Sequence, residues 1–202
     1  MSLLISFLFL FGAVSVASSR SIDALLIAGA FEGDILGVDP KQLNKIADAP
    51  MFWERNVVPF AIDSELDFIR RRAVEKAMLR IQDRTCIRFV ARQREEDYLH
   101  FTDGTGCASH VGRVGGCQDI IVGPECDQVG LVLHLLMHAL GFWHEESADD
   151  SSDYLLINWD NIREEDKIHF QTYSHRKSNH MSEPFDYRSL MYISPNAFAI
   201  DR

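Results

Sequence analysis

The stretch His134-Leu-Leu-Met-His138-Ala-Leu-Gly141-Phe-Trp-His144 decides how the chain folds around its chemistry. His134 and His138 are four residues apart, so on a helix their imidazoles share one face, one turn apart. Gly141 tolerates a positive φ, which allows a sharp turn and brings His144 towards the same point. Three converging imidazoles with a fourth position left open are a catalytic type of zinc site. The stretch therefore predicts that these three histidines bind zinc.

A simpler interpretation of this stretch has to be weighed. A histidine on an apolar helix is more often a satisfied core residue than a metal ligand. Here, however, a glycine and a third histidine follow at the H-x-x-x-H-x-x-G-x-x-H spacing of the metzincin peptidases. Three unpaired imidazoles buried in one apolar stretch would also be costly without a metal. The spacing therefore favours the zinc site.

Two helices are predicted from the apolar pattern. After Ser64, a typical N-cap, apolar residues recur at helical spacing and predict a helix over residues 65–83, with Arg70 on another face. Residues 129–140 are nearly all apolar, so a helix there must be buried. Gly141 then ends it.

Strands are predicted in the segments between these helices. The mixed aromatic and β-branched run 51–62 contains Pro59, which lacks an N–H and indicates an edge strand. Three further strands are expected at residues 86–90, 98–101 and 119–122. The glycine-rich segment 104–116 is expected to be loop, and the acidic segment 145–153 is expected to be a surface loop.

The start of the chain reads as a secretory signal. Residues 1–16 form an apolar run without charge, followed by the small residues Ala17, Ser18 and Ser19. The alternative is a membrane anchor, but about 14 apolar residues fall short of the roughly 20 that a spanning helix needs. We therefore expect a signal peptide over residues 1–17, a secreted, extracellular protein, and no membrane association once the signal is removed.

Composition narrows the class of function. The chain has 202 residues with 30 acidic and 20 basic side chains, a net charge of −10, which gives no reason to expect a nucleic-acid partner. In a secreted chain, the four cysteines (Cys86, Cys107, Cys117 and Cys126) are more often disulfides than metal ligands, and no CxxC pair occurs. Spacing alone leaves all three pairings open.

Several separate blocks resemble the astacin family of zinc peptidases, in the same order and from about Phe31 to Phe198. They are Phe31-Glu-Gly-Asp34, Thr85-Cys-Ile-Arg-Phe89, Cys107-Ala-Ser-His-Val-Gly-Arg113, the histidine stretch with Glu145, and Ser189-Leu-Met191. The resemblance implies an α+β, two-lobed metzincin-like domain. A twisted sheet and two long helices would form the upper lobe, with zinc in the cleft above a mostly irregular lower lobe.

The resemblance also implies a latency segment. In the family's propeptide motif the aspartate caps the zinc, and Asp34 takes that place here. A propeptide over residues 18–49 would then precede a peptidase domain over residues 50–202, with cleavage somewhere between Lys41 and Pro50.

Further roles follow from the same resemblance. Met191 would be the Met-turn methionine beneath the metal, and Glu145 would pair with the amino terminus freed by propeptide cleavage. Cys107 would form a disulfide with Cys126. The family's domain continues beyond Arg202 and there holds the partner of the residue aligned with Cys86, so Cys86 would be left over. Cys117 would be free or would pair with Cys86.

The sequence departs from the family at catalytic positions. Leu135 occupies the place of the general-base glutamate, which takes a proton from the attacking water and delivers it to the leaving amine. Losing a general base typically costs about 10² to 10⁴ in rate. Ile193 occupies the place of the tyrosine that stabilises the transition state, unless a one-residue slip lets Tyr192 serve. Ala148 replaces an arginine that makes structural ion pairs.

Three functions from different classes remain open on these grounds. The first is a relative with little or no proteolytic activity that binds zinc and takes peptide or protein ligands in its cleft, and it fits the sequence best. The second is an active zinc endopeptidase. Its base would be unidentified, because Glu145 and Glu146, the nearest carboxylates in sequence, are poor substitutes. The third is a partial gene product without a stable fold.

Overall fold

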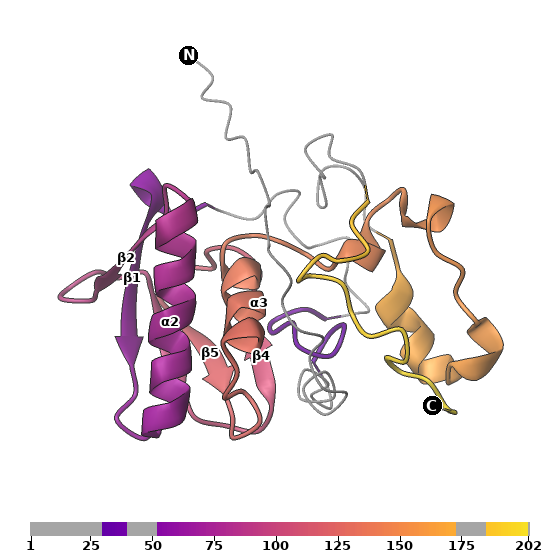
Figure 1. Cartoon of the computed structure of the whole chain (residues 1–202), viewed down its shortest axis with the longest axis horizontal. Coiled ribbons are helices and arrows are strands. Elements are labelled where there is room, and N and C mark those ends of the chain that lie inside the picture. Colours follow the sequence, from indigo (N-terminus) through magenta and orange to yellow (C-terminus); the bar gives the residue numbers. More distant parts are fainter. Residues whose placement is uncertain (1–29, 40–51, 173–184, 202) are drawn as a thin grey trace, which may run out of the picture.

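The computed structural model describes residues 30–39, 52–172 and 185–201 (Figure 1). The predicted signal peptide and the predicted cleavage region lie outside these residues. Among the residues described, no helix combines the length and apolarity needed to cross a bilayer. The strands are β1 (Val57–Ile62), β2 (Arg88–Ala91), β3 (Tyr98–Thr102), β4 (Cys107–Ser109) and β5 (Cys117–Val122), and the α-helices are α2 (Phe68–Arg84) and α3 (Val129–Ala139).

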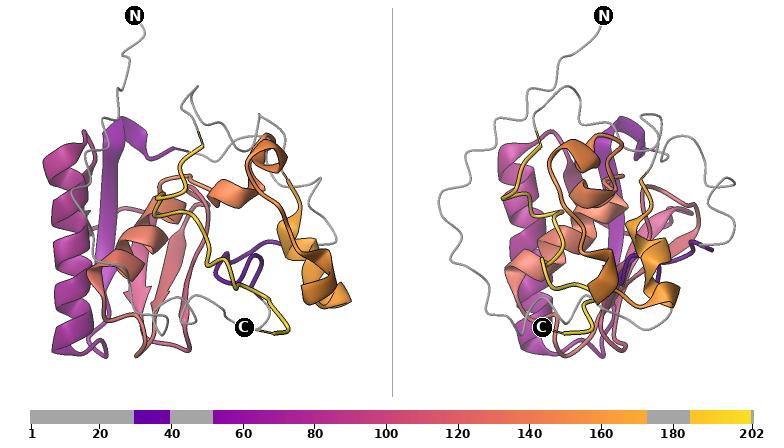
Figure 2. Two further views of the ribbon diagram at one scale, coloured as in Figure 1. Left: turned by 45° about the vertical axis from the view of Figure 1, so that its right-hand side comes forward. Right: turned by 90° about the vertical axis from the view of Figure 1, so that its right-hand side faces the viewer.

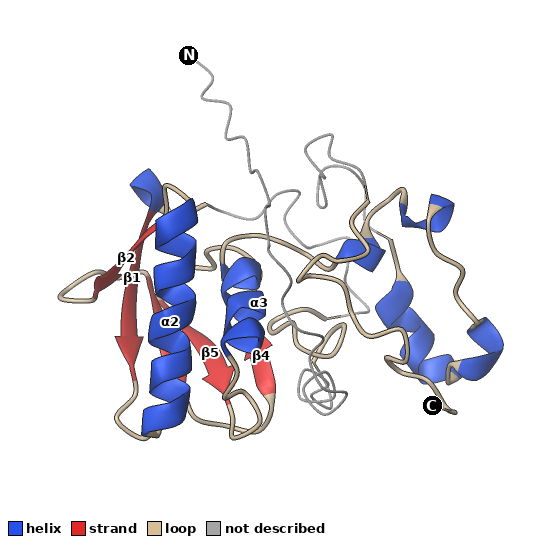
Figure 3. Ribbon diagram, viewed as in Figure 1, coloured by secondary structure: helices blue, strands red, loops and turns tan. Residues whose placement is uncertain are grey.

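The strands form one sheet in the order β2-β1-β3-β5-β4. β2, β1, β3 and β5 are mutually parallel, and β4 runs antiparallel to β5 at one edge. Both α-helices lie against the same face of this sheet (Figures 1 and 3). This α+β arrangement agrees with the fold class expected from the sequence.

The main core fills the space between that face and the two helices. Alternate strand residues point into it, as the two-residue period of a strand requires. The fully buried members from the strands are Val58, Leu99, Phe101, Ile120 and Val122. Helix α3 is buried nearly all round, as its apolar composition predicts. At the C-terminal end of this helix, Nε1 of Trp53 donates to the carbonyl of Ala139 at 2.8 Å. The core therefore fixes the position of the helix that carries His134 and His138.

Helix α2 begins later than predicted, and one of its arginines is buried. Its N-cap is Asp67 rather than Ser64, and the Asp67 carboxylate accepts from the backbone N–H of Arg70 at 3.0 Å. Arg70 is only 6% exposed, which corrects its predicted position on an outer face. Its guanidinium bonds Asp67, Asp103 and the carbonyl of Val122. It therefore ties the start of α2 to the end of β5.

Two predictions about strands were wrong. β1 is not an edge strand, because it lies between β2 and β3. Pairing of β1 with β3 begins only at Phe60, one residue after Pro59, so the missing N–H of the proline is accommodated. The segment expected to be loop contains β4, which has three residues, too few to give a period of two in the sequence.

The region after His144 is built from short 3₁₀ helices and irregular chain. The bounds are Glu145–Ser147, Ser151–Asp153, Trp159–Asn161 and Glu164–Phe170, and a further 3₁₀ turn, Glu54–Asn56, precedes β1. The predicted surface loop 145–153 was wrong in part, because Glu146, Ser147, Ala148 and Ser151 are buried. This region lies across from the sheet, with the segment 30–39 between them (Figures 1 and 2).

The cysteines divide into one bridge and two free thiols. Cys107 on β4 and Cys126 before α3 are joined by a disulfide, as the resemblance implied. Cys86 and Cys117 are free and exposed. Cys86 lies just before β2 and Cys117 begins β5, and the strands β1 and β3 lie between β2 and β5. At the usual strand spacing, β2 and β5 are therefore about 14 Å apart. A disulfide needs Cα atoms within about 7 Å, so these two thiols do not pair with each other in this fold.

The buried arginine leads to a test of stability. We expect Arg70→Ala to lower the free energy of unfolding by about 1–3 kcal/mol, because it removes charged hydrogen bonds and leaves the Val122 carbonyl without this donor. Arg80, on an exposed turn of the same helix, provides the control: Arg80→Ala should change stability by less than about 0.5 kcal/mol. Urea denaturation of both variants measures the difference, and equal midpoints would contradict the role given to Arg70.

Candidate metal centre

The three histidines of the decisive stretch converge, as predicted. Nε2 of His134 lies 3.0 Å from Nε2 of His138 and 3.2 Å from Nε2 of His144. Ligands bound at 2.0–2.1 Å in a tetrahedral zinc site are about 3.3 Å apart. All three side chains are buried, at 2% exposure or less. The three nitrogens therefore have the spacing of ligands to a single ion.

Helix geometry and one glycine produce this convergence. His134 and His138 lie on one face of α3, which ends at Ala139. Gly141 then takes a φ of 109°, a conformation that side-chain-bearing residues rarely adopt, and its N–H donates to the carbonyl of His138 at 2.8 Å. The reversal returns the chain so that His144 faces the helix.

The outward nitrogens of the three rings fix their orientation. Nδ1 of His134 lies 2.8 Å from the carbonyl of Leu190, and Nδ1 of His138 lies 2.8 Å from the carbonyl of Phe142. A carbonyl only accepts, so in both rings Nδ1 carries the hydrogen and Nε2 presents its lone pair to the centre. Metal-binding histidines are commonly held in this way. Lone pairs facing one another across about 3 Å repel unless a cation lies among them.

Asp34 lies over the same point. Its Oδ2 is 2.7 Å from Nε2 of His134 and 3.4 Å from Nε2 of His138, and its Oδ1 is 3.3 Å from Nε2 of His144. The carboxylate is 1% exposed, and Oδ1 accepts no hydrogen bond. A buried carboxylate oxygen without a donor, beside three ring nitrogens, fits a bound cation. The four ligand atoms lie within 4.8 Å of one another.

Burial and charge shift the titration of this cluster. Burial lowers the pKa of His138 to about 4, so its ring is neutral at physiological pH. Burial also acts to lower the pKa of His144, but Asp34 and Glu146 outweigh it and raise that pKa well above its usual value. Burial acts to raise the pKa of Asp34, and the three imidazoles together lower it well below its usual value. Zinc binds neutral imidazole and ionised carboxylate, so His138 and Asp34 are already in the binding form, whereas a zinc ion would have to displace a proton from His144.

The sequence did not predict a role for Glu32. Its Oε2 lies 2.8 Å from Nδ1 of His144, and its Oε1 accepts from the hydroxyl of Ser147 at 2.6 Å. It thereby orients the third histidine as the carbonyls orient the other two. Its N–H donates to Nδ1 of His169 at 2.9 Å. The one sequence feature that could have indicated this role is the position of Glu32 two residues before Asp34, in the Phe31-Glu-Gly-Asp34 motif.

The segment around Asp34 is held by backbone pairing and by apolar packing. The N–H groups of Phe31 and Ile35 each donate to the other's carbonyl, at 3.0 and 2.9 Å, which closes a tight turn. The N–H of Leu36 donates to the carbonyl of Ser109 on β4, and Ser109 donates to the carbonyl of Asp34. Phe31 and Ile35 are each 1% exposed and pack with Trp143. Edge strand β4 therefore positions Asp34.

Leu135 contributes no polar group to this centre. It follows His134 on α3, has no exposed surface and belongs to the apolar core. Leucine neither accepts nor donates a proton. An apolar, buried side chain, Leu135, therefore occupies the position at which the family resemblance places the general base.

The two glutamates after His144 face away from the converging nitrogens. Oε1 of Glu145 accepts from the N–H of Asp186 at 3.1 Å. Oε1 of Glu146 is 3.8 Å from Nδ1 of His144, on the side of the ring opposite Nε2. Burial raises the pKa of Glu146 to about 7, and its Oε2 accepts from the N–H of Ile193 at 3.3 Å.

The predicted Met-turn supports the centre through its backbone. Met191 is 4% exposed, and its carbonyl accepts from the N–H of Glu145 at 2.9 Å, while the neighbouring Leu190 carbonyl faces His134. Tyr192 packs its ring against Phe185. Tyr192 and Ile193 also line a cavity of about 210 Å³ whose walls are both apolar and polar, with Glu146 among them.

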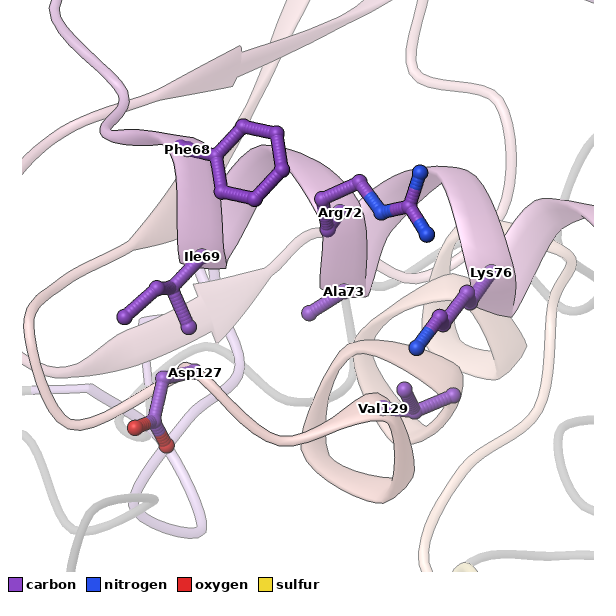
Figure 4. Close-up of a pocket in the computed structure, with 7 residues that line it drawn as sticks. All are labelled: Phe68, Ile69, Arg72, Ala73, Lys76, Asp127 and Val129. Carbon is purple, nitrogen blue, oxygen red and sulfur yellow. The ribbon is translucent and has the colours of Figure 1, made fainter.

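Another surface hollow lies away from this chemistry. It has a volume of about 330 Å³ between α2 and the start of α3 (Figure 4). It is lined by Phe68, Ile69, Arg72, Ala73, Lys76, Asp127 and Val129. None of these residues belongs to the histidine cluster, so the hollow is not the metal centre.

Comparison with known proteins agrees with this geometry. Residues 45–202 match the family model described as Astacin, a peptidase family. The chain belongs to the astacin family. Zinc metalloproteinase nas-6 of Caenorhabditis elegans is 38% identical over 181 residues, covering 85% of this chain and 53% of that protein. High choriolytic enzyme 1 of Oryzias latipes is 34% identical over 191 residues, covering 92% of this chain and 68% of that protein.

Solved structures support the astacin fold. The zinc-protease hatching enzyme of medaka superposes with a TM-score of 0.70 at 36% identity, covering 74% of this chain and 76% of that one. Myroilysin, with a TM-score of 0.52 and 18% identity, shares the fold alone. The chain spans about half the length of nas-6. Zinc is the metal of this family, and the donor set fits it.

Removing one ligand tests the centre. We expect His138→Ala to lower the zinc content of the purified uncleaved chain by one equivalent, because two imidazoles hold zinc far more weakly than three. Added zinc should then no longer raise the melting temperature through this site. His110→Ala provides the control, because His110 is a half-buried histidine outside the cluster. Elemental analysis after dialysis measures the content, and unchanged zinc in His138→Ala would contradict the ligand assignment.

Proposed function

We propose that this astacin-family chain is a secreted zinc protein with little or no peptidase activity. The observation that carries the proposal is Leu135, an apolar and fully buried residue directly after the first zinc ligand. His134, His138 and His144 would hold the ion, and a peptide or protein would occupy the cleft beside it. No nucleic-acid partner is included in the proposal.

The missing base accounts for the proposed inactivity. When bound, zinc polarises a carbonyl and acidifies water, but a general base is still needed to accept and pass on the proton. The carboxylates nearest in sequence are poor substitutes, because Glu145 bonds the Asp186 N–H and Glu146 lies on the outer side of the His144 ring. Ile193, at the proposed tyrosine position, has no side-chain donor for a developing oxyanion.

Latency is the second part of the proposal. Asp34 would fill the fourth position of the zinc, and Glu32 would hold His144, until cleavage between Lys41 and Pro50 removes residues 18–49 after the signal 1–17. Glu145 would then exchange the Asp186 N–H for the new amino terminus of a domain over residues 50–202. The Cys107–Cys126 disulfide supports export, because such bonds persist in oxidising compartments.

Restoring the base tests the first part of the proposal. We expect Leu135→Glu to raise peptide cleavage by the matured protein by about 10² or more, because a carboxylate then stands beside the zinc site. Leu135→Gln is the matched control, since glutamine has nearly the same shape as glutamate and is also polar but cannot act as a base. Turnover of a fluorogenic peptide is measured for both variants and the natural chain, with and without a chelator.

The outcomes of this experiment separate the alternatives. A gain for Leu135→Glu alone supports the proposal. Chelator-sensitive cleavage by the natural chain at the rate of a working peptidase would overturn it and indicate an unidentified base. A zinc-loaded Leu135→Glu variant without a gain would contradict Leu135 as the limiting defect and implicate Ile193.

The Asp34 cap has a test that needs no activity. We expect the uncleaved Asp34→Ala variant to lose zinc to a chelator about tenfold faster or more, because the fourth position then admits competing ligands. Asp39→Ala, at an exposed residue of the same segment, should exchange like the natural chain. Transfer of zinc to a chromogenic chelator gives the rate, and equal rates for both variants would argue against capping by Asp34.

A further inference from the structure

A second group of metal-ligand side chains lies on the outer face of the sheet. His100 on β3 pairs in register with Asp119 on β5, and Cys117 lies two residues before Asp119. Their neighbours Leu99, Gln118 and Ile120 point into the core, so these three side chains share the face opposite the helices. No astacin resemblance assigns them a role.

The three groups are already close together. Nδ1 of His100 lies 3.0 Å from Oδ1 of Asp119, and Sγ of Cys117 lies 4.0 Å from the same oxygen. One ligand atom from each residue fits within a span of 4.8 Å. Ligands of a tetrahedral zinc ion are about 3.3–3.8 Å apart, so small side-chain rotations suffice. Because core packing fixes the register of β3 and β5, the backbone already presents the site.

The chemistry of the set selects the class of ion. A thiolate, an imidazole and a carboxylate are ligands of zinc and of similar borderline-soft divalent metals, while magnesium and calcium prefer oxygen alone. A thiolate and a carboxylate together neutralise a divalent charge. The guanidinium of Arg92 stacks on the ring of Tyr98, on the same strand as His100, at 3.8 Å and donates to the carbonyl of Glu95. It is therefore held by other groups.

We propose that His100, Cys117 and Asp119 form a second, surface site for zinc or a similar transition-metal ion. A fourth position would remain open to solvent, because Cys117 is exposed and the Asp119 side chain is 54% exposed. The ion would bridge β3 and β5 and convert the Cys117 thiol to a bound thiolate, with the released proton passing to solvent. This proposal does not rest on the proposed function, because the histidine centre involves none of these residues.

Cobalt(II) distinguishes the two sites, because only the surface site contains sulfur. The uncleaved, metal-free chain, with its Cys107–Cys126 disulfide intact, is titrated with cobalt(II) and followed in the near ultraviolet, where thiolate-to-cobalt charge transfer absorbs. We expect this band in the natural chain and its loss in Cys117→Ser. Cys86→Ser is the matched control, since Cys86 is the other free, exposed thiol, and it should keep the band. His100→Ala should weaken cobalt binding at this site by about tenfold or more.

Zinc provides an independent readout. Saturating zinc should slow alkylation of Cys117 but leave alkylation of Cys86 unchanged, and Cys117→Ser should bind one equivalent fewer than the natural chain. Absence of the charge-transfer band, or its persistence in Cys117→Ser, would overturn the site. Equal protection of both thiols by zinc would do so as well, because it would indicate non-specific thiol binding. The histidine centre would keep its ion in each of these cases.

Discussion

Three imidazole nitrogens directed at one buried point are the constraint on which the rest of this structure depends. Without a cation, these nitrogens would repel across about 3 Å and Asp34 would be buried with an oxygen that accepts no hydrogen bond. Their positions need a helix for the first two rings, the reversal at Gly141 for the third, and acceptors behind each ring. The carbonyls of Phe142 and Leu190 and the carboxylate of Glu32 are those acceptors. Parts of the chain more than a hundred residues apart therefore meet at this point.

The same dependence explains what the sequence could predict. The spacing of His134, His138 and His144 predicted that their rings converge, because helix geometry and one glycine are local properties. The buried helix α3 followed from its apolar run. The burial of Arg70, the short strand β4 and the role of Glu32 depend on partners far along the chain. Arg70 gives no local sign that Asp103 and Val122 will surround it. Burial of residues 146–148 in an acidic stretch was missed for the same reason.

Leu135 shows how stability and chemistry compete at one helical position. The residue after His134 is fully buried within the apolar core between the sheet and the two helices. A carboxylate at a buried site loses hydration, and an active enzyme must offset that cost at the metal. Leucine there adds apolar contacts and avoids the cost, while the ligand spacing on α3 is unchanged. The proposed loss of the base is therefore compatible with a stable fold that keeps the histidines in place, since metal binding and proton transfer would use different residues.

The sheet separates the constraints on its two faces. On the inner face Leu99, Phe101 and Ile120 are locked by the helices, so a shift of one residue would expose them. This fixes the register of β3 against β5, and on the outer face the His100–Asp119 contact joins the same two strands. The amino-acid type at each outward-facing position can then change, but the position of that residue in the sheet cannot. His100, Cys117 and Asp119 are therefore held close together by the core on the opposite face of the sheet. A surface ligand set can form there without disturbing the histidine centre.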